Sequence, residues 1–327
     1  DISKICLGTW QFSGKEDMMW GSSFDESNAD KIIKKSIELG INCFDTAEAY
    51  GLNNYSEKVL GSSLNKYAKR EDVFICSKFG KHDGSKSIKY DKNMLAESLT
   101  KSLEALQTNY IDLYQIHWSV NVSNIEEMEK ELNSYIQQGK IKNKGVCNYG
   151  VKSLSEWNGL ISNQLPYNLL WRPLEYDIIL YYKKNNIDIF AYSSLQQGIL
   201  TGKFCNPEFN IDIIPESRLR TRHFHYSRTQ YSRHNTNGVE DILANTMNKL
   251  ITLPENLTQI SLQWLLNNGV KSVIVGVNSV DQISELVSYV NNPIDINILN
   301  KATEYTNDLK YSLGSNPDMW SQETRYN

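Results

Sequence analysis

Short apolar runs alternate with longer amphipathic stretches along most of this 327-residue chain. Such alternation is typical of parallel strands joined by right-handed helical crossovers. Eight such runs favour a closed (β/α)8 TIM barrel, an α/β fold. We expect its strands at residues 5–7, 41–44, 73–76, 111–116, 144–147, 168–170, 187–192 and 272–275.

The stretches between these runs predict helices at residues 26–39, 57–67, 92–106, 124–138, 153–161, 178–185, 239–249, 258–267 and 279–290. A further segment, 296–311, predicts an extra C-terminal helix outside the barrel. Asp25 stands where an N-cap is expected, and Ser153 is followed by Glu156 at capping-box spacing.

The length fits one large domain, because an α/β barrel takes about 250 residues and insertions extend it. We therefore expect a single barrel domain over residues 1–327. Residues 203–238 show no clear period and form a long insertion after the seventh expected strand. We expect this insertion to rise from the carboxyl face of the barrel as a lid, with cations that meet a phosphate; the alternative is a solvated loop without a specific role.

Composition excludes several classes of protein. Hydrophobic residues make up 40% of the chain, charged residues 22%, and the net charge is −4, which favours neither nucleic acid nor an anionic membrane as partner. No stretch approaches the roughly 20 apolar residues that cross a bilayer. The five cysteines are an odd number without paired spacing, so we expect buried reduced thiols, no metal site and a cytoplasmic protein, with an upstream targeting segment left open.

Four polar residues follow three of the expected strands: Asp45, Tyr50, Lys78 and His117. Their spacing suits one strand and one crossover helix per step, so we expect all four side chains at the carboxyl edge of one sheet. Tyrosine is a poor acid near neutral pH unless a cation stabilises its phenolate. Lys78, held by Asp45, would be that cation, and His117 would hydrogen-bond the oxygen of a bound carbonyl.

The same site implies a cofactor. A carbonyl that gains a proton at oxygen must gain a hydride at carbon, which no side chain delivers, so a reduced nicotinamide is implied. Each residue also has a simpler explanation: a helix cap for Asp45, a loop aromatic for Tyr50, a surface cation for Lys78 and a strand-end histidine for His117. Their shared placement after three consecutive strands favours the catalytic interpretation.

These residues resemble the catalytic tetrad of the aldo-keto reductases. The resemblance rests on Phe-Asp-Thr-Ala-Glu-Ala-Tyr-Gly at 44–51, Ser-Lys at 77–78 and Gln-Ile-His-Trp at 115–118. Segments 8–10, 145–149, 191–195, 198–203 and 276–285 are similar to other motifs of the family, in the same order. Within it, Gly276 and Gln282 are typical of the branch that contains potassium-channel β-subunits and bacterial stress-type reductases.

The resemblance implies roles position by position. Asn148 and Gln164 would hold the nicotinamide carboxamide, Tyr192 would stack on its ring, and Trp10 and Trp118 would line the substrate pocket. The other residues implied to bind the cofactor, NADP, are Gly8, Thr9, Ser193, Leu195, Gly198, Lys203, Arg218, Gly276, Asn278, Gln282 and Glu285, with Trp10 among them.

The activity implied is NADPH-dependent reduction of a small aldehyde or ketone to an alcohol. The alternative is a nicotinamide-binding, redox-sensing interaction subunit with little turnover, like a channel β-subunit. The physiological substrate and the oligomeric state stay open.

Overall fold

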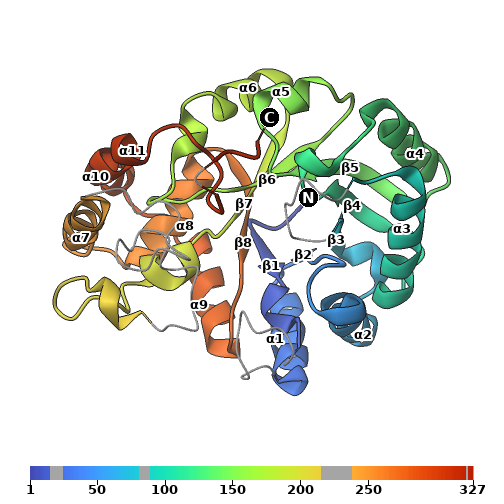
Figure 1. Cartoon of the computed structure of the whole chain (residues 1–327). Coiled ribbons are helices and arrows are strands. Elements are labelled where there is room, and N and C mark those ends of the chain that lie inside the picture. The colour runs from blue at the N-terminus through green and yellow to red at the C-terminus, as the bar shows by residue number, and fades with distance from the viewer. Residues whose placement is uncertain (15–24, 81–88, 215–237, 322, 327) are drawn as a thin grey trace.

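The computed structural model describes residues 1–14, 25–80, 89–214, 238–321 and 323–326. Its parallel strands form a closed barrel in chain order, because β1 pairs with both β2 and β8 (Figure 1). The expected (β/α)8 fold is confirmed. The strands are β1 (Ile5–Gly8), β2 (Cys43–Asp45), β3 (Phe74–Phe79), β4 (Ile111–Ile116), β5 (Ile141–Cys147), β6 (Ser162–Pro166), β7 (Asp188–Tyr192) and β8 (Val270–Val275).

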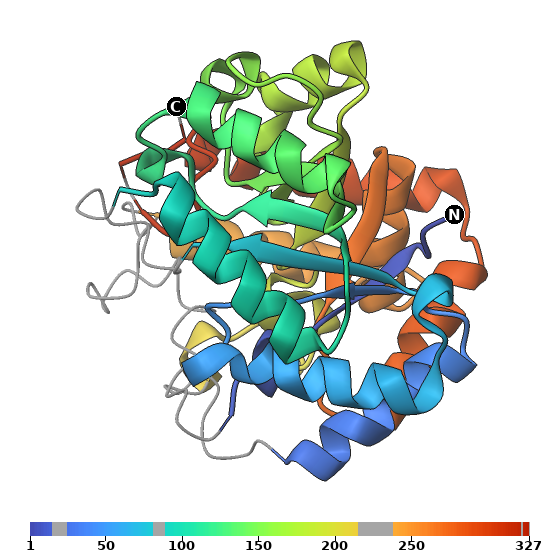
Figure 2. The ribbon, with the colours of Figure 1, turned by 90° about the vertical axis from the view of Figure 1, so that its right-hand side faces the viewer.

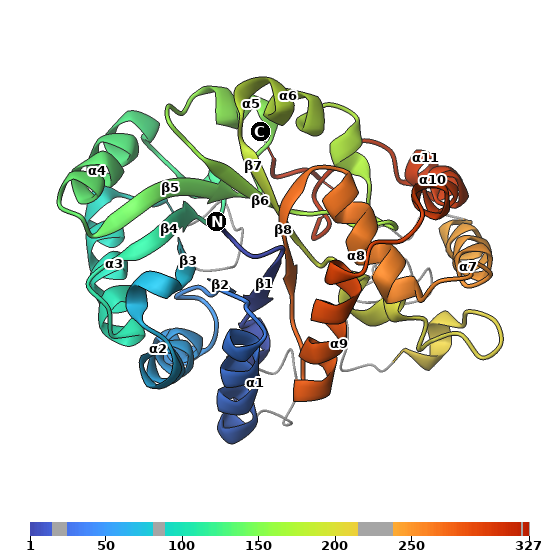
Figure 3. The ribbon, with the colours of Figure 1, turned by 180° about the vertical axis from the view of Figure 1, so that it is seen from behind.

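Helices surround the strands on all sides, as the views from the front and from behind show (Figures 1 and 3). Side chains cap several of them; Asp25, for example, accepts a hydrogen bond from the backbone N–H of Ser27, as its expected capping role requires. The helices are α1 (Glu26–Glu38), α2 (Tyr55–Tyr67), α3 (Lys92–Leu106), α4 (Ile125–Gln137), α5 (Val151–Ser155), α6 (Ile178–Asn185), α7 (Val239–Leu250), α8 (Leu257–Asn267), α9 (Val280–Asn291), α10 (Ile296–Tyr305) and α11 (Asn307–Leu313).

The sixth strand was predicted in the wrong place. It is not 168–170 but β6, whose buried positions include the polar residues Asn163 and Gln164. A search for apolar runs misses such a strand. The apolar residues that follow form a turn, in which the Asn168 side chain accepts hydrogen bonds from the backbone N–H groups of Leu170 and Trp171.

Two helix predictions were also wrong in detail. Ser153 lies inside the short helix α5, whose N-cap is Gly150, so the expected capping box does not form. The expected terminal helix is split into α10 and α11 at Thr306. In a continuous helix the Thr303 carbonyl would accept a hydrogen bond from the backbone N–H of residue 307. Here it accepts one from Arg172 Nη1.

The interior of the barrel contains a small apolar cluster. Its buried members are Cys6, Cys43, Cys76, Leu113, Phe190 and Ile274. The three thiol sulfurs lie within 4.8 Å of one another. All five cysteines are free, as expected, and four are buried, but Cys205 is only half-buried, so the expectation of burial was wrong there. Three thiols so close are a group that could hold a metal ion, and the expectation that the protein has no metal site stays a prediction.

The functional face is the one where the strands end. Seen from the side, the N-terminus and the C-terminus lie on opposite sides of the barrel, and the C-terminus lies at the carboxyl ends of the strands (Figure 2). Most of the long insertion, including Arg218, lies outside the described residues, so its role as a lid stays a prediction. Among the helices that the structure describes, none is long and apolar enough to cross a membrane.

Candidate active site

The four predicted catalytic residues meet at the carboxyl end of the barrel. Asp45 ends β2, Lys78 lies in β3, His117 follows β4, and Tyr50 lies in the loop after β2. Lys78 Nζ donates to both carboxylate oxygens of Asp45 at 2.8 Å, to the Thr46 carbonyl at 2.7 Å and to the Tyr50 hydroxyl at 3.2 Å. Because the Tyr50 oxygen accepts this bond, its own proton is directed elsewhere.

Burial decides the electrostatics of this group. Lys78 has no exposed surface. Burial acts to lower the pKa of its ammonium, but attraction to Asp45 outweighs this, so the pKa of Lys78 lies above its ordinary value. Burial also raises the pKa of Tyr50 to about 12, although Lys78 acts to lower it. Tyr50 is therefore protonated at neutral pH, the form that an acid needs, and Lys78 offsets only part of the cost of burying a phenolate.

His117 is oriented by a backbone contact. Its Nδ1 lies 3.1 Å from the Gly80 carbonyl oxygen, and because a carbonyl can only accept, Nδ1 carries the proton in this bond. A neutral imidazole with this tautomer has a lone pair on Nε2. Donation from Nε2 to a substrate oxygen therefore requires the doubly protonated imidazolium.

A cavity of about 480 Å³ opens beside these residues. It is lined by Asp45, Tyr50 and His117 at one end and extends past β7 and β8 to Asn278, Gln282 and Glu285 at the other. The structure thus brings most of the expected cofactor residues together: Gly8, Trp10, Asn148, Gln164, Tyr192, Ser193, Leu195, Gly198, Lys203, Gly276, Asn278, Gln282 and Glu285 all line it.

Three of the described residues predicted for the site do not line the cavity: Lys78, Thr9 and Trp118. Lys78 lies behind Asp45 and Tyr50, to which it is hydrogen-bonded. Thr9 is buried beneath the lining, where its hydroxyl donates to the Asp45 carbonyl. Trp118 is buried under the Arg325 guanidinium, which lies 4.0 Å from the ring centroid, so its place in the substrate pocket stays a prediction. Arg218 lies outside the described residues.

Two side-chain amides present complementary groups. Asn148 Oδ1 accepts from the Tyr192 hydroxyl at 2.8 Å and from the Tyr326 hydroxyl at 2.7 Å, while its Nδ2 donates to the His117 carbonyl. Gln164 Nε2 donates to Asp45 Oδ1 at 2.7 Å. Asn148 thus retains one N–H and Gln164 its carbonyl oxygen, which together match a primary carboxamide.

Motif reading missed several residues of the cavity. Trp320 lines it from near the C-terminus, stacked on Tyr192 with ring centroids 6.3 Å apart. Gln197 also lines it, and its buried Nε2 has no hydrogen-bond partner among the described residues. Gln197 lies between two recognised motifs, so its position in the sequence could have indicated that it lines the site. No local pattern in the sequence indicates such a role for Trp320.

Comparison with known proteins identifies the family. The family model described as Aldo/keto reductase family matches residues 4–305. The chain belongs to the aldo-keto reductase family. Members are oxidoreductases that use a nicotinamide cofactor, and carbonyl reduction is the general activity that this membership supports.

Relatives in this family have different names. The chain is 35% identical over 208 residues to aldo-keto reductase YhdN of Bacillus subtilis, a match that covers 62% of this chain and 61% of the relative. It is 28% identical over 309 residues to the NADH-specific methylglyoxal reductase of Escherichia coli, covering 89% and 90%. It is 25% identical over 301 residues to a probable voltage-gated potassium channel subunit beta of Oryza sativa, covering 87% and 86%.

Solved structures agree on the fold. The glycerol dehydrogenase AKR11B4 of Gluconobacter oxydans matches with a TM-score of 0.75 and 24% identity, over 97% of this chain and 94% of the other. An aldo/keto reductase from Klebsiella pneumoniae, in complex with NADP and acetate, matches with a TM-score of 0.67 and 20% identity, over 93% and 92%.

Proposed function

We propose that this protein reduces a small aldehyde or ketone to an alcohol with NADPH, and that Tyr50 is the general acid. The observation that carries the proposal is the buried contact of 3.2 Å between Lys78 Nζ and the Tyr50 hydroxyl, with Asp45 holding Lys78 from the other side. If Asp45 and Lys78 served only to stabilise the fold, they would not require the Tyr50 hydroxyl beside them in the lining of a cavity.

The residues act on the substrate as follows. Tyr50 and His117 line the cavity and would both face the oxygen of a bound carbonyl. Tyr50 would transfer its proton to this oxygen, and Lys78 would stabilise the phenolate that remains. Imidazolium His117 would donate from Nε2 and orient the carbonyl. Trp10, stacked on Tyr50 with centroids 5.6 Å apart, would exclude water from this step.

The lining of the cavity fits a nicotinamide dinucleotide. A bound reduced nicotinamide supplies the hydride that the carbonyl carbon needs. Asn148 and Gln164 would hold its carboxamide through the N–H and carbonyl oxygen that remain available. A Cβ on Gly198 would come within 2.7 Å of Lys203 Nζ, so glycine leaves room for this cation beside a phosphate of the cofactor.

The preference for NADPH over NADH rests on charge. Among the described residues that line the cavity towards Asn278, Lys203 supplies positive charge and Glu285 negative charge. Lys203 would attract a phosphate, with Arg218 as the second cation. One relative is named as NADH-specific and one similar structure contains NADP, so relatives alone do not decide between the cofactors.

A second function is suggested by the likeness to a channel β-subunit, which covers 87% of this chain. In that version the barrel binds the cofactor tightly, turns over slowly and reports the nicotinamide state to a partner protein. The single-domain organisation of residues 1–327 and a cytoplasmic location are parts of the proposal for either function.

The test is a fluorescence titration of the purified protein with NADPH and NADH, followed by absorbance decay with a panel of small aldehydes and ketones. Tight NADPH binding with turnover supports the reductase. Tight binding without turnover across the panel supports the sensing subunit. Absence of binding to either nucleotide contradicts both functions.

A further inference from the structure

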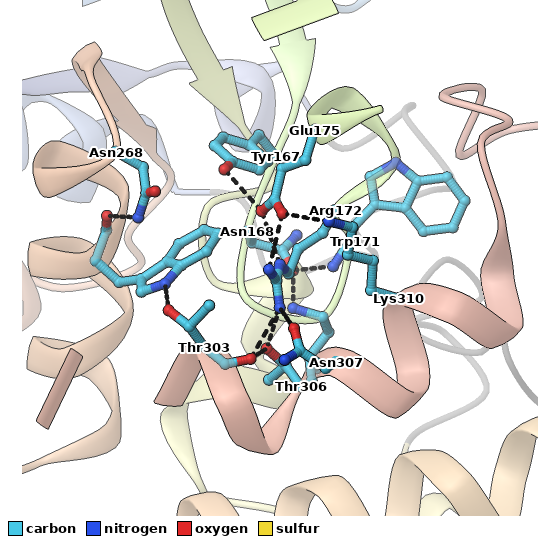
Figure 4. A network of polar contacts seen from close by, with 12 residues as sticks. Tyr167, Asn168, Trp171, Arg172, Glu175, Asn268, Thr303, Thr306, Asn307 and Lys310 are labelled. Carbon is cyan, nitrogen blue, oxygen red and sulfur yellow. Dashed lines mark hydrogen bonds and ion pairs between the residues drawn. The ribbon is translucent and has the colours of Figure 1, made fainter. Parts of the chain in front are cut away.

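The C-terminal segment, which the structure describes over residues 315–321 and 323–326, follows a helix that a polar network anchors. The Arg172 guanidinium donates to both carboxylate oxygens of Glu175, at 2.7 and 2.8 Å, and reaches Thr306 and Asn307 at the junction of α10 and α11 (Figure 4). Lys310 of α11 donates to Glu175 at 2.8 Å. These contacts, one buried and the others partly buried, fix α11 against the loop after β6, so the chain that follows α11 starts from a defined place.

An ion pair between Asp318 and Arg325 joins two parts of the C-terminal segment. Arg325 donates from Nε to Asp318 Oδ2 at 2.6 Å and from Nη2 to Oδ1 at 2.8 Å. Asp318 has no exposed surface, and Arg325 lies over the Trp118 ring. A buried bidentate pair is geometrically demanding, so it holds the two ends of the segment in register. Tyr326, the residue after Arg325, is thereby brought beside Asn148, which lines the cavity.

Tyr326 reaches a residue of the cofactor site. Its hydroxyl donates to Asn148 Oδ1 at 2.7 Å, beside the Tyr192 hydroxyl, which donates to the same oxygen. Tyr192 is itself held by the indole N–H of Trp320, which donates to its hydroxyl at 2.7 Å. Two residues of the C-terminal segment thus act on one amide, Tyr326 directly and Trp320 through Tyr192.

These contacts determine which way the amide faces. An amide oxygen has two lone pairs, and the two tyrosines occupy both. Rotating the amide by half a turn would break the two bonds that its oxygen accepts and would set that oxygen against the carbonyl of His117, which can only accept. The observed orientation leaves one N–H of Asn148 for a ligand, and that N–H is what a carboxamide oxygen requires.

We propose that Tyr326 is a positioning residue, which orients the Asn148 amide so that its remaining N–H is presented to the nicotinamide carboxamide. This inference rests on the proposed function, since it assumes that the nicotinamide lies beside Asn148. It gives the C-terminal segment a part in cofactor binding that no motif in the sequence indicates.

The experiment compares two ligands on the Tyr326→Phe variant. NADPH contains the nicotinamide, whereas 2′-phospho-ADP-ribose has the same phosphates and adenosine without it. Because one net hydrogen bond contributes about 1 kcal/mol, the variant should bind NADPH about fivefold to tenfold more weakly and bind 2′-phospho-ADP-ribose as the wild type does. The exposed Tyr311→Phe variant, a matched loss of one hydroxyl, should change neither affinity.

The outcomes separate this inference from the proposed function. Equal NADPH affinity in wild type and Tyr326→Phe overturns the positioning role, as does an equal loss for both ligands, which would show a general disturbance of the site. Failure of the wild type to bind NADPH overturns the proposed function itself. If Tyr326→Phe does not fold, Trp320→Phe, which removes the N–H donated to Tyr192, should show the same selective loss.

Discussion

Gln164 Nε2 donates a hydrogen bond to Asp45 Oδ1 at 2.7 Å, which joins the residue expected to hold the cofactor to the ion pair expected to tune the acid. The same Asp45 oxygen accepts from Lys78 at 2.8 Å. Asp45 is therefore held from two strands, β6 and β3. Because the Gln164 amide nitrogen is bound to Asp45, the Gln164 carbonyl oxygen is the atom that would accept a hydrogen bond from the NH2 group of a nicotinamide carboxamide.

Removing the charge of Asp45 should be costly in both stability and activity. Asp45→Asn keeps the shape but leaves the Lys78 ammonium buried without a counter-charge, which should cost about 3–5 kcal/mol of unfolding free energy. Denaturant titration measures this. Glu97→Gln breaks the exposed pair with Lys101 and should leave the unfolding free energy nearly unchanged. Similar losses for the two variants would contradict the importance assigned to the buried pair.

Glu57 should make stability depend on pH. Its carboxyl is buried beside Ser77 and Asn54, and burial raises its pKa to about 7 from the ordinary 4.5. Between these two pH values the folded protein keeps a proton that the unfolded chain has released, so the unfolding free energy should fall as pH rises, by roughly 3 kcal/mol in total.

Glu57→Gln should remove this part of the pH dependence, because glutamine does not titrate. Denaturant titrations at pH 5 and pH 8 measure it, with the exposed Glu71→Gln as the matched control. A slope in Glu57→Gln as steep as in the wild type would show that other groups carry the effect.

Lys203 should discriminate between the two nucleotides. If its ammonium meets a phosphate that NADH lacks, Lys203→Ala should raise the Kd for NADPH more than the Kd for NADH, and the difference should shrink at high salt. Lys184→Ala, an exposed lysine of α6 away from the cavity, is the control. Equal losses for both nucleotides would place Lys203 at the shared pyrophosphate instead.

Much of the site could be predicted from sequence because it is built on strand ends. Asp45, Lys78 and His117 each come at or just after an apolar run, and parallel strands bring such positions to one edge. The polar strand β6 could not be found this way, because its residues bond to Asp45 and to backbone groups instead of packing as an apolar layer.

The C-terminal segment could not be predicted for a different reason. Trp320 lines the cavity and Tyr326 contacts Asn148, and the chain that carries both follows α11. This helix is docked on Arg172 and Glu175, more than 130 residues away in the chain. Such a contact depends on tertiary packing and leaves no periodic or local pattern. Gln197, by contrast, lies between the recognised motifs 191–195 and 198–203, so its position in the sequence could have marked it as a candidate.

Gly51 should be intolerant of a side chain. It has φ of +84°, and an added Cβ would lie 2.1 Å from the Ser13 carbonyl oxygen. Gly51→Ala should therefore destabilise the protein by more than the roughly 1–2 kcal/mol of the left-handed conformation alone, and displace the loop that carries Tyr50. Gly40→Ala has a similar φ of +82° with no atom within 4 Å, so it shows the effect of a side chain at positive φ without a clash. Thermal or chemical unfolding compares them; equal destabilisation would argue against the clash.

The most direct test of the account is Tyr50→Phe, assayed for NADPH binding by fluorescence and for carbonyl reduction by absorbance. The phenylalanine keeps the ring that stacks on Trp10 but has no proton to give. We expect the reduction rate to fall at least about 100-fold, with the Kd for NADPH unchanged, while the half-exposed Tyr176→Phe reduces at the wild-type rate. Reduction by Tyr50→Phe at close to the wild-type rate would contradict the assignment of Tyr50 as the acid.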